Sequence, residues 1–567
     1  MNDEKVNIKS YRDIPIAAAS LGKMSVNKTA SWRNAEPYYE EKSAPCNLGC
    51  PAGTDVVKYL HLATQGKYEE GWKTILNTNP FPATCGRVCP HPCEVNCNRE
   101  NLGGRLNIHM IERFLGDVNF DKKLEPEFLE DKKDKSIGVV GAGPAGLSCA
   151  YQMARRGYGV TVYEALSEPG GMMRVGIPDY RLPKEILTRE IDFILDHGVK
   201  LKLNTRIGKE ITFEDIRAEH DAVYVATGLH LSRNLGAEGQ ELEDVIPGIE
   251  VLRKIAFKDE ISLGDEILVV GGGNTALDAA RSVLRMGCKP RIVYRRSREE
   301  MPAIAEEIED LIEEGIPIDF LTLPKRVYGN DNGKIVKVEC VRMELGEPDD
   351  SGRRRPVEIE GSNFNVEADM VITAIGEQPD LSYLTSDVKA ESWGVLVDGY
   401  GRTNLPDVFA GGDSATGDGT VTHAVGHGRQ TALAIDAFLK GEDPPDCEVI
   451  EHSVEGRSMH QVEWEEINPV YFEPAERLKP KGLEIPHRVK NFEEVYSGFT
   501  EEEVLHETSR CMSCGNCPEC DNCLVFCPDS AVTKNPDGGY TINYEFCKGC
   551  GICVAECPRS AISIKVL

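Results

Sequence analysis

The stretch from Lys135 to Glu164 reads KSIGVVGAGPAGLSCAYQMARRGYGVTVYE, and the rest of the chain is interpreted from it. An apolar run, Ser136–Val140, leads into Gly141-x-Gly143-x-x-Gly146, an alanine-rich helical pattern and a second run, Val160–Tyr163. In such a unit the first glycine makes the tight turn, the second admits a pyrophosphate, and the third lets helix and strand pack closely. The stretch predicts a dinucleotide-binding unit whose helix N-terminus binds phosphate and whose terminal acid, Glu164, binds a ribose.

A second unit of this kind begins at residue 265, where DEILVVGGGNTALDAARSVLRMG contains Gly271-x-Gly273-x-x-Ala276. The apolar run that follows it ends in Arg295 and Arg296 instead of an acid. Arginines at this point accommodate a 2′-phosphate through charge-assisted hydrogen bonds. We therefore predict that the first unit binds FAD and the second NADP(H). The alternative is a solvated arginine pair, with NAD(H) as the nucleotide.

The totals of the chain exclude some classes of function. The 567 residues carry a formal net charge of −29, which disfavours nucleic acid as a partner because phosphate binding needs a basic surface. The longest apolar runs are only as long as strands, and the N-terminus lacks a signal-peptide pattern. We therefore expect a cytoplasmic protein without a membrane span.

Ten of the 20 cysteines lie between Cys511 and Cys557. Two runs with the spacing C-x2-C-x2-C-x3-C-P predict two [4Fe–4S] clusters, in which the fourth cysteine of each run ligates the other cluster. One cluster takes Cys517, Cys520, Cys523 and Cys557, and the other takes Cys547, Cys550, Cys553 and Cys527. Cys511 and Cys514 form a further pair upstream, which could bind another centre with outside help; we expect free thiols and no additional cluster.

Six more cysteines lie between Cys46 and Cys97, mostly one helical turn apart and beside helix-ending prolines. Thiolates gathered in turns suit iron–sulfur ligation, and zinc is the less favoured alternative because C-x2-C pairs are missing here. From about residue 44 to 440, the order of a helical cysteine domain and a glycine-rich flavin domain resembles the glutamate synthase small-subunit family. That family includes relatives such as the N-terminal half of dihydropyrimidine dehydrogenase and the large subunit of NADH-dependent ferredoxin:NADP oxidoreductase.

The resemblance implies one N-terminal cluster held by Cys50, Cys89, Cys93 and Glu112. Cys46 and Cys97 match two ligands of a second cluster, but the upstream C-x2-C pair that completes it in the family is missing here. We therefore expect three [4Fe–4S] clusters in all. It stays open whether Cys97 or Cys46 replaces Glu112.

The same resemblance places a glycine-rich segment at residues 169–187 beside the flavin, and a Gly-Gly-Asp turn near its ribityl chain. The residues expected at FAD are Gly141, Gly143, Pro144, Ala145, Gly146, Glu164, Gly171, Arg174, Gly412, Asp413 and Thr422. Those expected at NADP(H) are Gly271, Gly273, Asn274, Thr275, Ala276, Arg295 and Arg296.

The predicted fold is α/β, with two Rossmann-like domains, one inserted in the other, an N-terminal α-helical iron–sulfur domain and a C-terminal α+β bacterial ferredoxin domain. Alternating runs between residues 316 and 375 predict a β-meander. The expected bounds are an arm at 1–43, the helical domain at 44–130, the FAD domain at 131–250 and 370–440, the NADP(H) domain at 251–369, a connector at 441–505 and the ferredoxin domain at 506–567.

These features predict an electron-transfer flavoprotein that exchanges electrons between NAD(P)H, with NADPH favoured, FAD, [4Fe–4S] clusters and a ferredoxin or partner redox subunit. Electron bifurcation and the direction of flow are left open. One alternative is the glutamate synthase small subunit, which feeds an amidotransferase large subunit. Another is an iron–sulfur redox-sensing scaffold without turnover. We predict no catalytic side chain, because the cofactors carry the chemistry.

Overall fold

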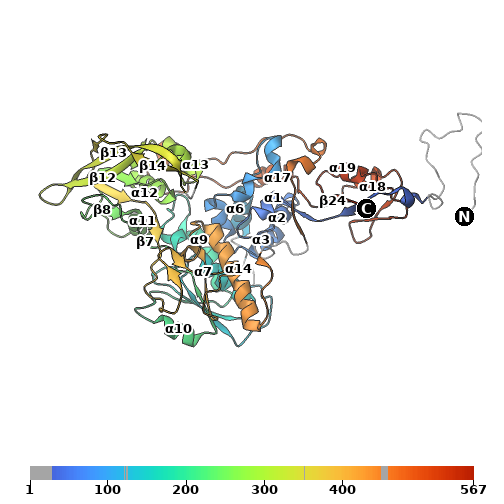
Figure 1. Cartoon of the computed structure of the whole chain (residues 1–567), viewed down its shortest axis with the longest axis horizontal. Helices are drawn as coiled ribbons and strands as arrows, with labels where there is room; N and C mark the ends of the chain where they lie inside the picture. Colours follow the sequence, from blue (N-terminus) through green and yellow to red (C-terminus); the bar gives the residue numbers. More distant parts are fainter. Residues whose placement is uncertain (1–27, 120–121, 123–125, 350–351, 448–456) are drawn as a thin grey trace, which may run out of the picture. The chain divides into compact units, whose positions relative to one another are not determined.

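The structure is a computed structural model that describes residues 28–119, 122, 126–349, 352–447 and 457–567 (Figure 1). Two compact units divide these residues. Within the described ranges, the smaller unit contains residues 28–45, 457–473 and 512–567, and the larger unit contains residues 46–447 and 474–511. In the described part of the chain, no helix is long and apolar enough to span a bilayer.

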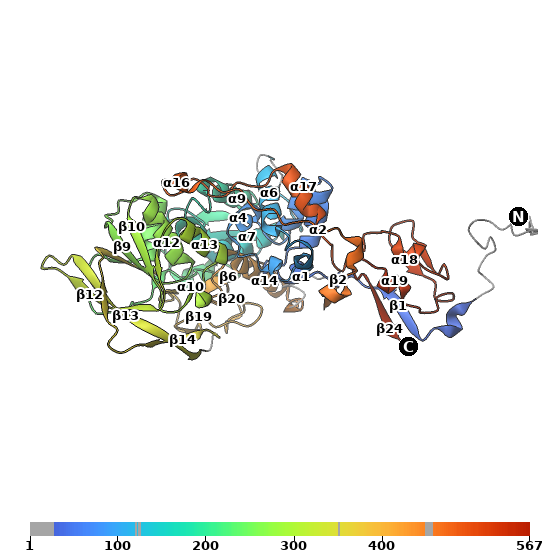
Figure 2. The same ribbon diagram turned by 90° about the horizontal axis from the view of Figure 1, so that it is seen from above.

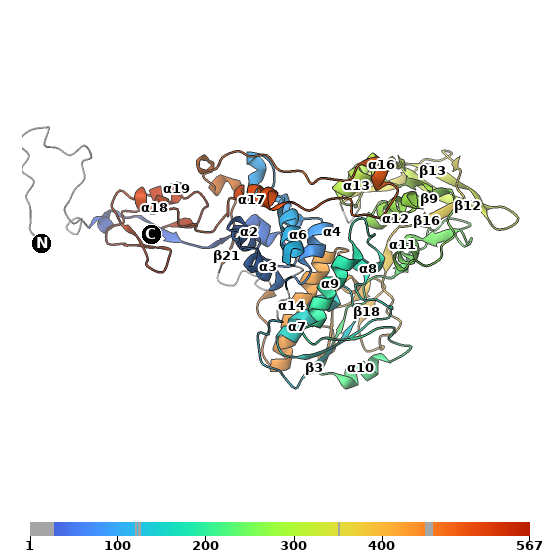
Figure 3. The same ribbon diagram turned by 180° about the vertical axis from the view of Figure 1, so that it is seen from behind.

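A parallel five-stranded sheet with the order β20-β6-β3-β4-β5 forms the first nucleotide domain of the larger unit. Its strands are β3 (Ser136–Val140), β4 (Gly159–Tyr163), β5 (Lys200–Lys202), β6 (Ala222–Val225) and β20 (Val408–Ala410). Helices α7 (Pro144–Arg155) and α14 (Val421–Lys440) lie side by side in Figures 1 and 3. They approach closely because Gly428 has no side chain: a Cβ there would lie 2.2 Å from the Ala145 carbonyl oxygen.

The second parallel sheet has the order β11-β10-β9-β16-β8. Its strands are β8 (Val245–Pro247), β9 (Glu266–Val270), β10 (Lys289–Val293), β11 (Ile318–Asp319) and β16 (Met370–Thr373), with helices α11 (Gly248–Phe257), α12 (Asn274–Arg285) and α13 (Ala305–Glu313). Because β8 and β16 both belong to this sheet, the second domain starts before residue 251 and ends after residue 369. The chain crosses between the domains a few residues outside the bounds expected from the sequence.

An antiparallel sheet extends the second domain, as the alternating runs predict. It contains β12 (Thr322–Gly329), β13 (Ile335–Pro348), β14 (Arg354–Glu358) and β15 (Phe364–Val366). Shorter elements of the larger unit are α8 (Met172–Val175), α10 (Phe213–Glu219), α16 (Ile485–Arg488), β7 (Leu231–Ser232), β17 (Glu377–Gln378), β18 (Ala390–Glu391), β19 (Gly394–Val395), η4 (Asn98–Leu102), η5 (Arg298–Glu300) and η6 (Gly412–Ser414).

The helical domain of the larger unit packs around Tyr59, Leu60 and Ile111. Its elements are α1 (Pro45–Leu48), α2 (Val56–Thr64), α3 (Tyr68–Leu76), α4 (Pro82–Val88), α5 (Pro92–Val95) and α6 (Ile108–Asn119). A helix from much later in the chain, α17 (Glu501–Ser509), packs against α2 and α6 (Figure 3). Buried Glu190 on α9 (Lys184–Leu195) accepts hydrogen bonds from the backbone N–H groups of Ala83 and Thr84, at 2.7 and 3.1 Å, and so joins α4 to the first nucleotide domain.

The smaller unit combines both ends of the described chain. Strand β1 (Ala35–Tyr39) pairs antiparallel with β24 (Ile562–Val566), as Figure 2 shows. The other elements are β2 (Lys42–Ser43), β21 (Ser458–Gln461), β22 (Val532–Lys534), β23 (Tyr540–Ile542), α18 (Asn522–Val525), α19 (Ile552–Ala555), η3 (Thr29–Trp32), η7 (Trp464–Glu466) and η8 (Pro469–Tyr471). Residues 35–43 are therefore an integral part of this unit, which corrects the expectation of a separate arm at 1–43. The expected arm's residues 1–27 lie outside the described ranges.

Candidate functional site

The first glycine loop has the geometry that its sequence predicts. Gly141 has φ +107°, and a Cβ there would lie 2.5 Å from the Ala226 carbonyl oxygen. A Cβ on Gly146 would lie 2.0 Å from the Gly141 carbonyl oxygen. A Cβ on Gly143, in contrast, would have only Gly171 Cα within 4 Å, at 3.9 Å. Gly141 and Gly146 permit tight backbone packing. Gly143 leaves open space at the N-terminus of α7, which suits a pyrophosphate.

Several residues expected at FAD converge on this open space. Gly171 has φ +52°, and a Cβ there would approach Gly143 Cα to 2.8 Å. Gly412 has φ +61°, and a Cβ there would approach the Ala145 side chain to 2.8 Å. Asp413 follows Gly412 and accepts a hydrogen bond from the Gly419 N–H at 2.9 Å. The glycine-rich segment and the Gly-Gly-Asp turn therefore both reach the first loop, although they lie far apart in the sequence.

Two charged residues predicted to contact FAD, Glu164 and Arg174, form hydrogen bonds with neighbouring residues of the protein. Glu164 is buried, and its carboxylate accepts hydrogen bonds from the N–H groups of Ala142 at 2.8 Å and Leu166 at 2.9 Å. This fixes the acid at the glycine loop, where each oxygen keeps further acceptor capacity for a ribose. The Arg174 guanidinium donates to the Pro169 carbonyl at 3.1 Å and to the Thr188 hydroxyl at 2.9 Å. It braces the segment, so a contact with the flavin stays a prediction.

The second glycine loop repeats the arrangement of the first. A Cβ on Gly271 would lie 2.0 Å from the Ala374 carbonyl oxygen, while a Cβ on Gly273 would have no atom within 4 Å. Asn274 Oδ1 accepts a hydrogen bond from the Ile304 N–H at 3.0 Å, and the Thr275 hydroxyl bonds the Glu377 carboxylate. Because Gly273 precedes the first turn of α12, the open space again lies at a helix N-terminus that is able to bind phosphate.

The two arginines after β10 have different environments. Arg295 is exposed, and the partial desolvation of its guanidinium, followed by the nearby Arg296 charge, lowers its pKa. Arg296 is buried and donates to the Arg354 carbonyl at 2.8 Å and to the Asp349 carboxylate at 2.5 Å. Arg296 thus ties β10 to the antiparallel sheet, whereas Arg295 is exposed and its contact with NADP(H) stays a prediction.

The predicted N-terminal cluster residues gather in the helical domain. Cys50, Cys89, Cys93 and Glu112 interact with one another electrostatically; Cys89 and Cys93 are buried, and Cys50 and Glu112 are partly buried. Burial raises the pKa of Cys89 to about 12 and that of Glu112 to about 8. Without metal these groups therefore hold their protons, and iron would have to displace the protons on binding. Three thiols and one carboxyl form a donor set that fits an iron–sulfur cluster.

Thr422 connects this donor set to the predicted flavin site. Its buried hydroxyl lies 3.9 Å from Cys85 Sγ and also forms a hydrogen bond with Cys89. On the next turn of α14, a Cβ on Gly426 would lie 2.0 Å from the Pro51 carbonyl oxygen, beside Cys50. The N-terminal part of α14 thus contacts the cysteine turns on one side and follows the Gly412 turn on the other. Sequence reasoning missed Cys85, although its spacing to Cys89 was the available signal.

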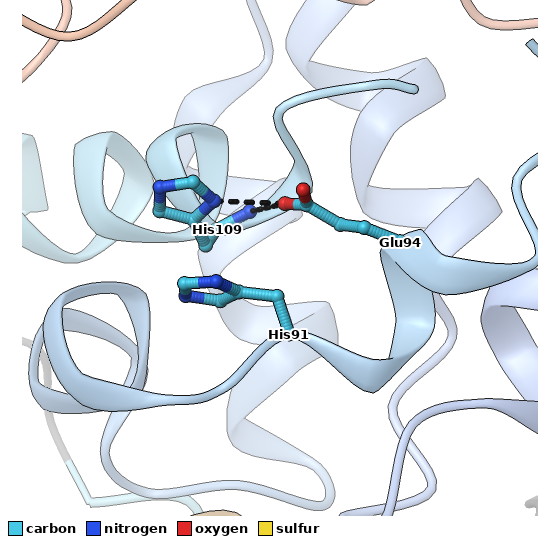
Figure 4. Close-up of side chains that lie close together, drawn as sticks. All are labelled: His91, Glu94 and His109. Atoms are coloured by element: carbon cyan, nitrogen blue, oxygen red, sulfur yellow. Dashed lines mark hydrogen bonds and ion pairs between the residues drawn. The ribbon is translucent and has the colours of Figure 1, made fainter. Parts of the chain in front are cut away.

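His91, Glu94 and His109 also lie close together near Cys93 (Figure 4). His109 Nδ1 lies 2.8 Å from Glu94 Oε1, and Arg477 Nη2 lies 2.8 Å from Glu94 Oε2. The two imidazole rings stack, with centroids 3.8 Å apart and an interplanar angle of 22°. Ring-nitrogen lone pairs lie in the ring planes, so stacked rings do not direct them at a common ion. We interpret this group as a hydrogen-bonded brace for the turn between Cys89 and Cys93.

The C-terminal cysteines fall into the two predicted sets. One set lines a single pocket in the smaller unit: Cys527, Cys547, Cys550 and Cys553. In the other set, burial and then Cys557, Cys523 and Cys520 raise the pKa of Cys517. The crossed pairing, in which the fourth cysteine of each run joins the other set, is therefore present in the geometry. Each set offers the four thiols that a [4Fe–4S] cluster needs.

Strand β1 supplies contacts that sequence reasoning missed. The Tyr39 hydroxyl donates to Cys523 Sγ at 3.2 Å, and Pro37 lines the pocket of the other cysteine set. Arg33 Nη1 donates to the Tyr544 carbonyl at 2.6 Å. Residues 33–39 contain no cysteine or glycine, so no local sequence pattern predicts that these residues cover the cluster loops.

Comparisons with known proteins match three parts of the sequence. Residues 135–428 match the pyridine nucleotide-disulphide oxidoreductase family. Residues 22–124 match dihydropyrimidine dehydrogenase domain II, 4Fe-4S cluster, and residues 540–563 match a 4Fe-4S binding domain. These matches confirm the predicted fold class and the FAD/NAD(P)-type and iron–sulfur domains.

Similar proteins include subunits of several complexes. NADPH-Fe(3+) oxidoreductase subunit beta of Geobacter sulfurreducens is 37% identical over 518 residues, which cover 85% of this chain and 76% of the relative. NADP(+)-dependent formate dehydrogenase subunit beta of Moorella thermoacetica is 40% identical over 504 residues, covering 83% and 70%. The glutamate synthase [NADPH] small chain of Escherichia coli is 34% identical over 417 residues, covering 70% and 88%.

Proposed function

Because this chain belongs to the pyridine nucleotide-disulphide oxidoreductase family and carries 4Fe-4S domains, we propose that it transfers electrons between NADPH and a partner redox subunit through FAD and three [4Fe–4S] clusters. It is an NAD(P)H-dependent oxidoreductase. When bound, the flavin would exchange electron pairs with nicotinamide and single electrons with the clusters. The chain's own contribution is to position the flavin, the nicotinamide and the clusters and to shield them from solvent.

The observation that carries this proposal is the position of α14 in the larger unit. Its Thr422 contacts the N-terminal cysteine turns, and its N-terminus follows the Gly412 turn, which reaches the first glycine loop. A flavin held by that loop would therefore lie beside the donor set of Cys50, Cys89, Cys93 and Glu112.

The relatives' names favour a partner subunit. The Geobacter and Moorella proteins are each called a beta subunit, of an Fe(3+) oxidoreductase and of a formate dehydrogenase. We propose that this chain likewise exchanges electrons with a partner redox subunit or a ferredoxin. The glutamate synthase small-chain alternative is weaker, because that match covers 70% of this chain, against 85% and 83% for the others.

Anaerobic reduction tests the proposal. We expect protein purified without oxygen to contain FAD and iron, to be bleached by NADPH, and to pass electrons to a one-electron dye. A protein that holds iron but reduces no dye would support the redox-sensing scaffold instead. Copurification of an amidotransferase large chain from the native host would support the glutamate synthase alternative.

Replacing Arg295 tests the nucleotide preference. We expect Arg295→Ala to raise the KM for NADPH by about 10- to 100-fold, because a charge-assisted hydrogen bond contributes about 1.5–3 kcal/mol. The KM for NADH should change little, since NADH lacks the 2′-phosphate. Steady-state dye reduction with each nucleotide measures both values.

Arg298→Ala is the matched control, because Arg298 is also exposed near β10 but pairs with Glu309. It should leave both KM values within about twofold, as most surface substitutions do. An equal rise in KM for NADH and NADPH in Arg295→Ala would contradict a 2′-phosphate contact.

A further inference from the structure

Cys511 lies beside Cys97 in the larger unit, although 413 residues separate them in the sequence. Together with Cys46, both thiols pack against the hydrophobic core of the helical domain that also contains Tyr59, Leu106 and Val504. Cys97 therefore has another cysteine beside it, although it is not one of the predicted ligands Cys50, Cys89 and Cys93. Two thiols that neither the FAD site nor the predicted clusters need, Cys97 and Cys511, therefore lie together near the end of α17, and Cys46 contacts the same hydrophobic core.

Buried polar contacts hold these segments together. The Glu507 carboxylate accepts hydrogen bonds from the N–H groups of Asn107 at 2.9 Å and Leu478 at 3.2 Å. The Arg510 guanidinium donates to the carbonyls of Gly103 at 2.8 Å and Gly104 at 2.6 Å. Glu507 and Arg510 are almost wholly buried and form an ion pair with each other. Breaking such contacts is costly, so the loop after Cys97 and the end of α17 are rigidly joined next to Cys511.

The sulfur of Cys97 has the environment of the predicted cluster ligands. It accepts hydrogen bonds from the N–H groups of Arg99 and Leu106. The Arg99 N–H lies two residues after the cysteine that accepts its hydrogen bond. The same type of hydrogen bond occurs at Cys89, whose sulfur accepts from the His91 N–H at 3.3 Å. It recurs again in the smaller unit, where Cys517 accepts from Glu519 and Cys547 accepts from Gly549. Such bonds to sulfur tune iron–sulfur centres.

A buried cation faces the same thiols. Arg99 is only 3% exposed, and it interacts electrostatically with both Cys97 and Cys511. The guanidinium thus supplies a positive charge beside both sulfurs, which would offset the negative charge of a thiolate-ligated cluster.

We propose that Cys46, Cys97 and Cys511 ligate a fourth iron–sulfur cluster, of the [4Fe–4S] type. This revises the expectation that Cys511 is a free thiol. The inference adds to the proposed function, because the three other clusters and FAD do not depend on it.

Iron content and spectroscopy of anaerobically purified full-length protein test the proposal. Four clusters correspond to about 16 iron atoms per chain and three correspond to about 12. We expect about 16 in the natural protein and about 12 in both Cys511→Ala and Cys46→Ala, with FAD content unchanged. The EPR signal of the fully reduced protein should lose about one spin in four.

Cys288→Ala is the matched control, because Cys288 is a partly buried cysteine far in sequence from both cysteine groups. It should keep all the iron. The fourth cluster would be overturned by about 12 iron atoms in the natural protein, or by unchanged iron in Cys511→Ala and Cys46→Ala. If these variants instead lost one zinc ion, the site would exist but would not hold an iron–sulfur cluster. Failure of NADPH to bleach the flavin would instead refute the proposed function, whatever the iron count.

Discussion

Replacing Gly143 with aspartate is expected to give a folded protein that purifies without FAD. Gly143 has φ −80° and ψ −177°, which any residue adopts, and the space around its Cβ position is open. Aspartate is also a favoured residue at the N-terminal cap of a helix, so α7 should form normally. Its carboxylate, however, would occupy the place of a phosphate. Two charges about 4 Å apart near a protein surface repel by about 4 kcal/mol, which corresponds to about a 10³-fold loss of affinity.

The flavin absorbance of the purified Gly143→Asp protein measures this effect. Circular dichroism and the thermal midpoint should stay near those of the FAD-free natural protein, which separates loss of the ligand from loss of the fold. The iron content should also stay close to normal. A yellow Gly143→Asp protein with a full complement of FAD would show that the first glycine loop does not bind the flavin pyrophosphate.

The same substitution in the second loop should separate the two nucleotide sites. Gly273 has φ −95° and ψ 175°, and a Cβ there would have no neighbour within 4 Å. We expect Gly273→Asp to keep its FAD but to need about 10³-fold more NADPH for the same rate of flavin bleaching. Stopped-flow absorbance measures that rate.

Dithionite should still bleach the flavin of Gly273→Asp, because it does not need the nucleotide site. The two variants serve as controls for each other, since they carry the same new side chain in equivalent loops. Loss of FAD from Gly273→Asp, or normal bleaching by NADPH, would contradict the assignment of the second loop.

The sequence predicted the nucleotide loops well because their chemistry is local. Gly141, Gly146 and Gly271 are needed for contacts with backbone atoms close to them in the fold, and these contacts follow from one strand–turn–helix unit. The strand before the first loop was expected at Ser136–Val140 and is observed at those residues. The crossed sets of C-terminal cysteines were also predictable, because two short runs determine them.

Long-range contacts were not predictable in this way. Arg296 follows β10 as a phosphate-binding arginine would, but its partner is Asp349, 53 residues later. Cys511 looks like half of an isolated pair until α17 brings it beside Cys97. Such pairings depend on how separate segments pack, and spacing within a segment carries no information about them. Residues 35–39 were missed for the same reason.

The pairing of β1 with β24 affects how the protein is made and how it can be cut. Because Ile562–Val566 are synthesised long after Ala35–Tyr39, β1 must wait for its partner while the whole flavoprotein portion emerges. Assembly of the ferredoxin-like unit is therefore completed only after the flavoprotein portion has been made. A truncation that removes only residues 512–567 would leave β1 as an unpaired edge that invites aggregation. A flavoprotein fragment free of the smaller unit therefore requires removal of both ends and of the internal residues 457–473.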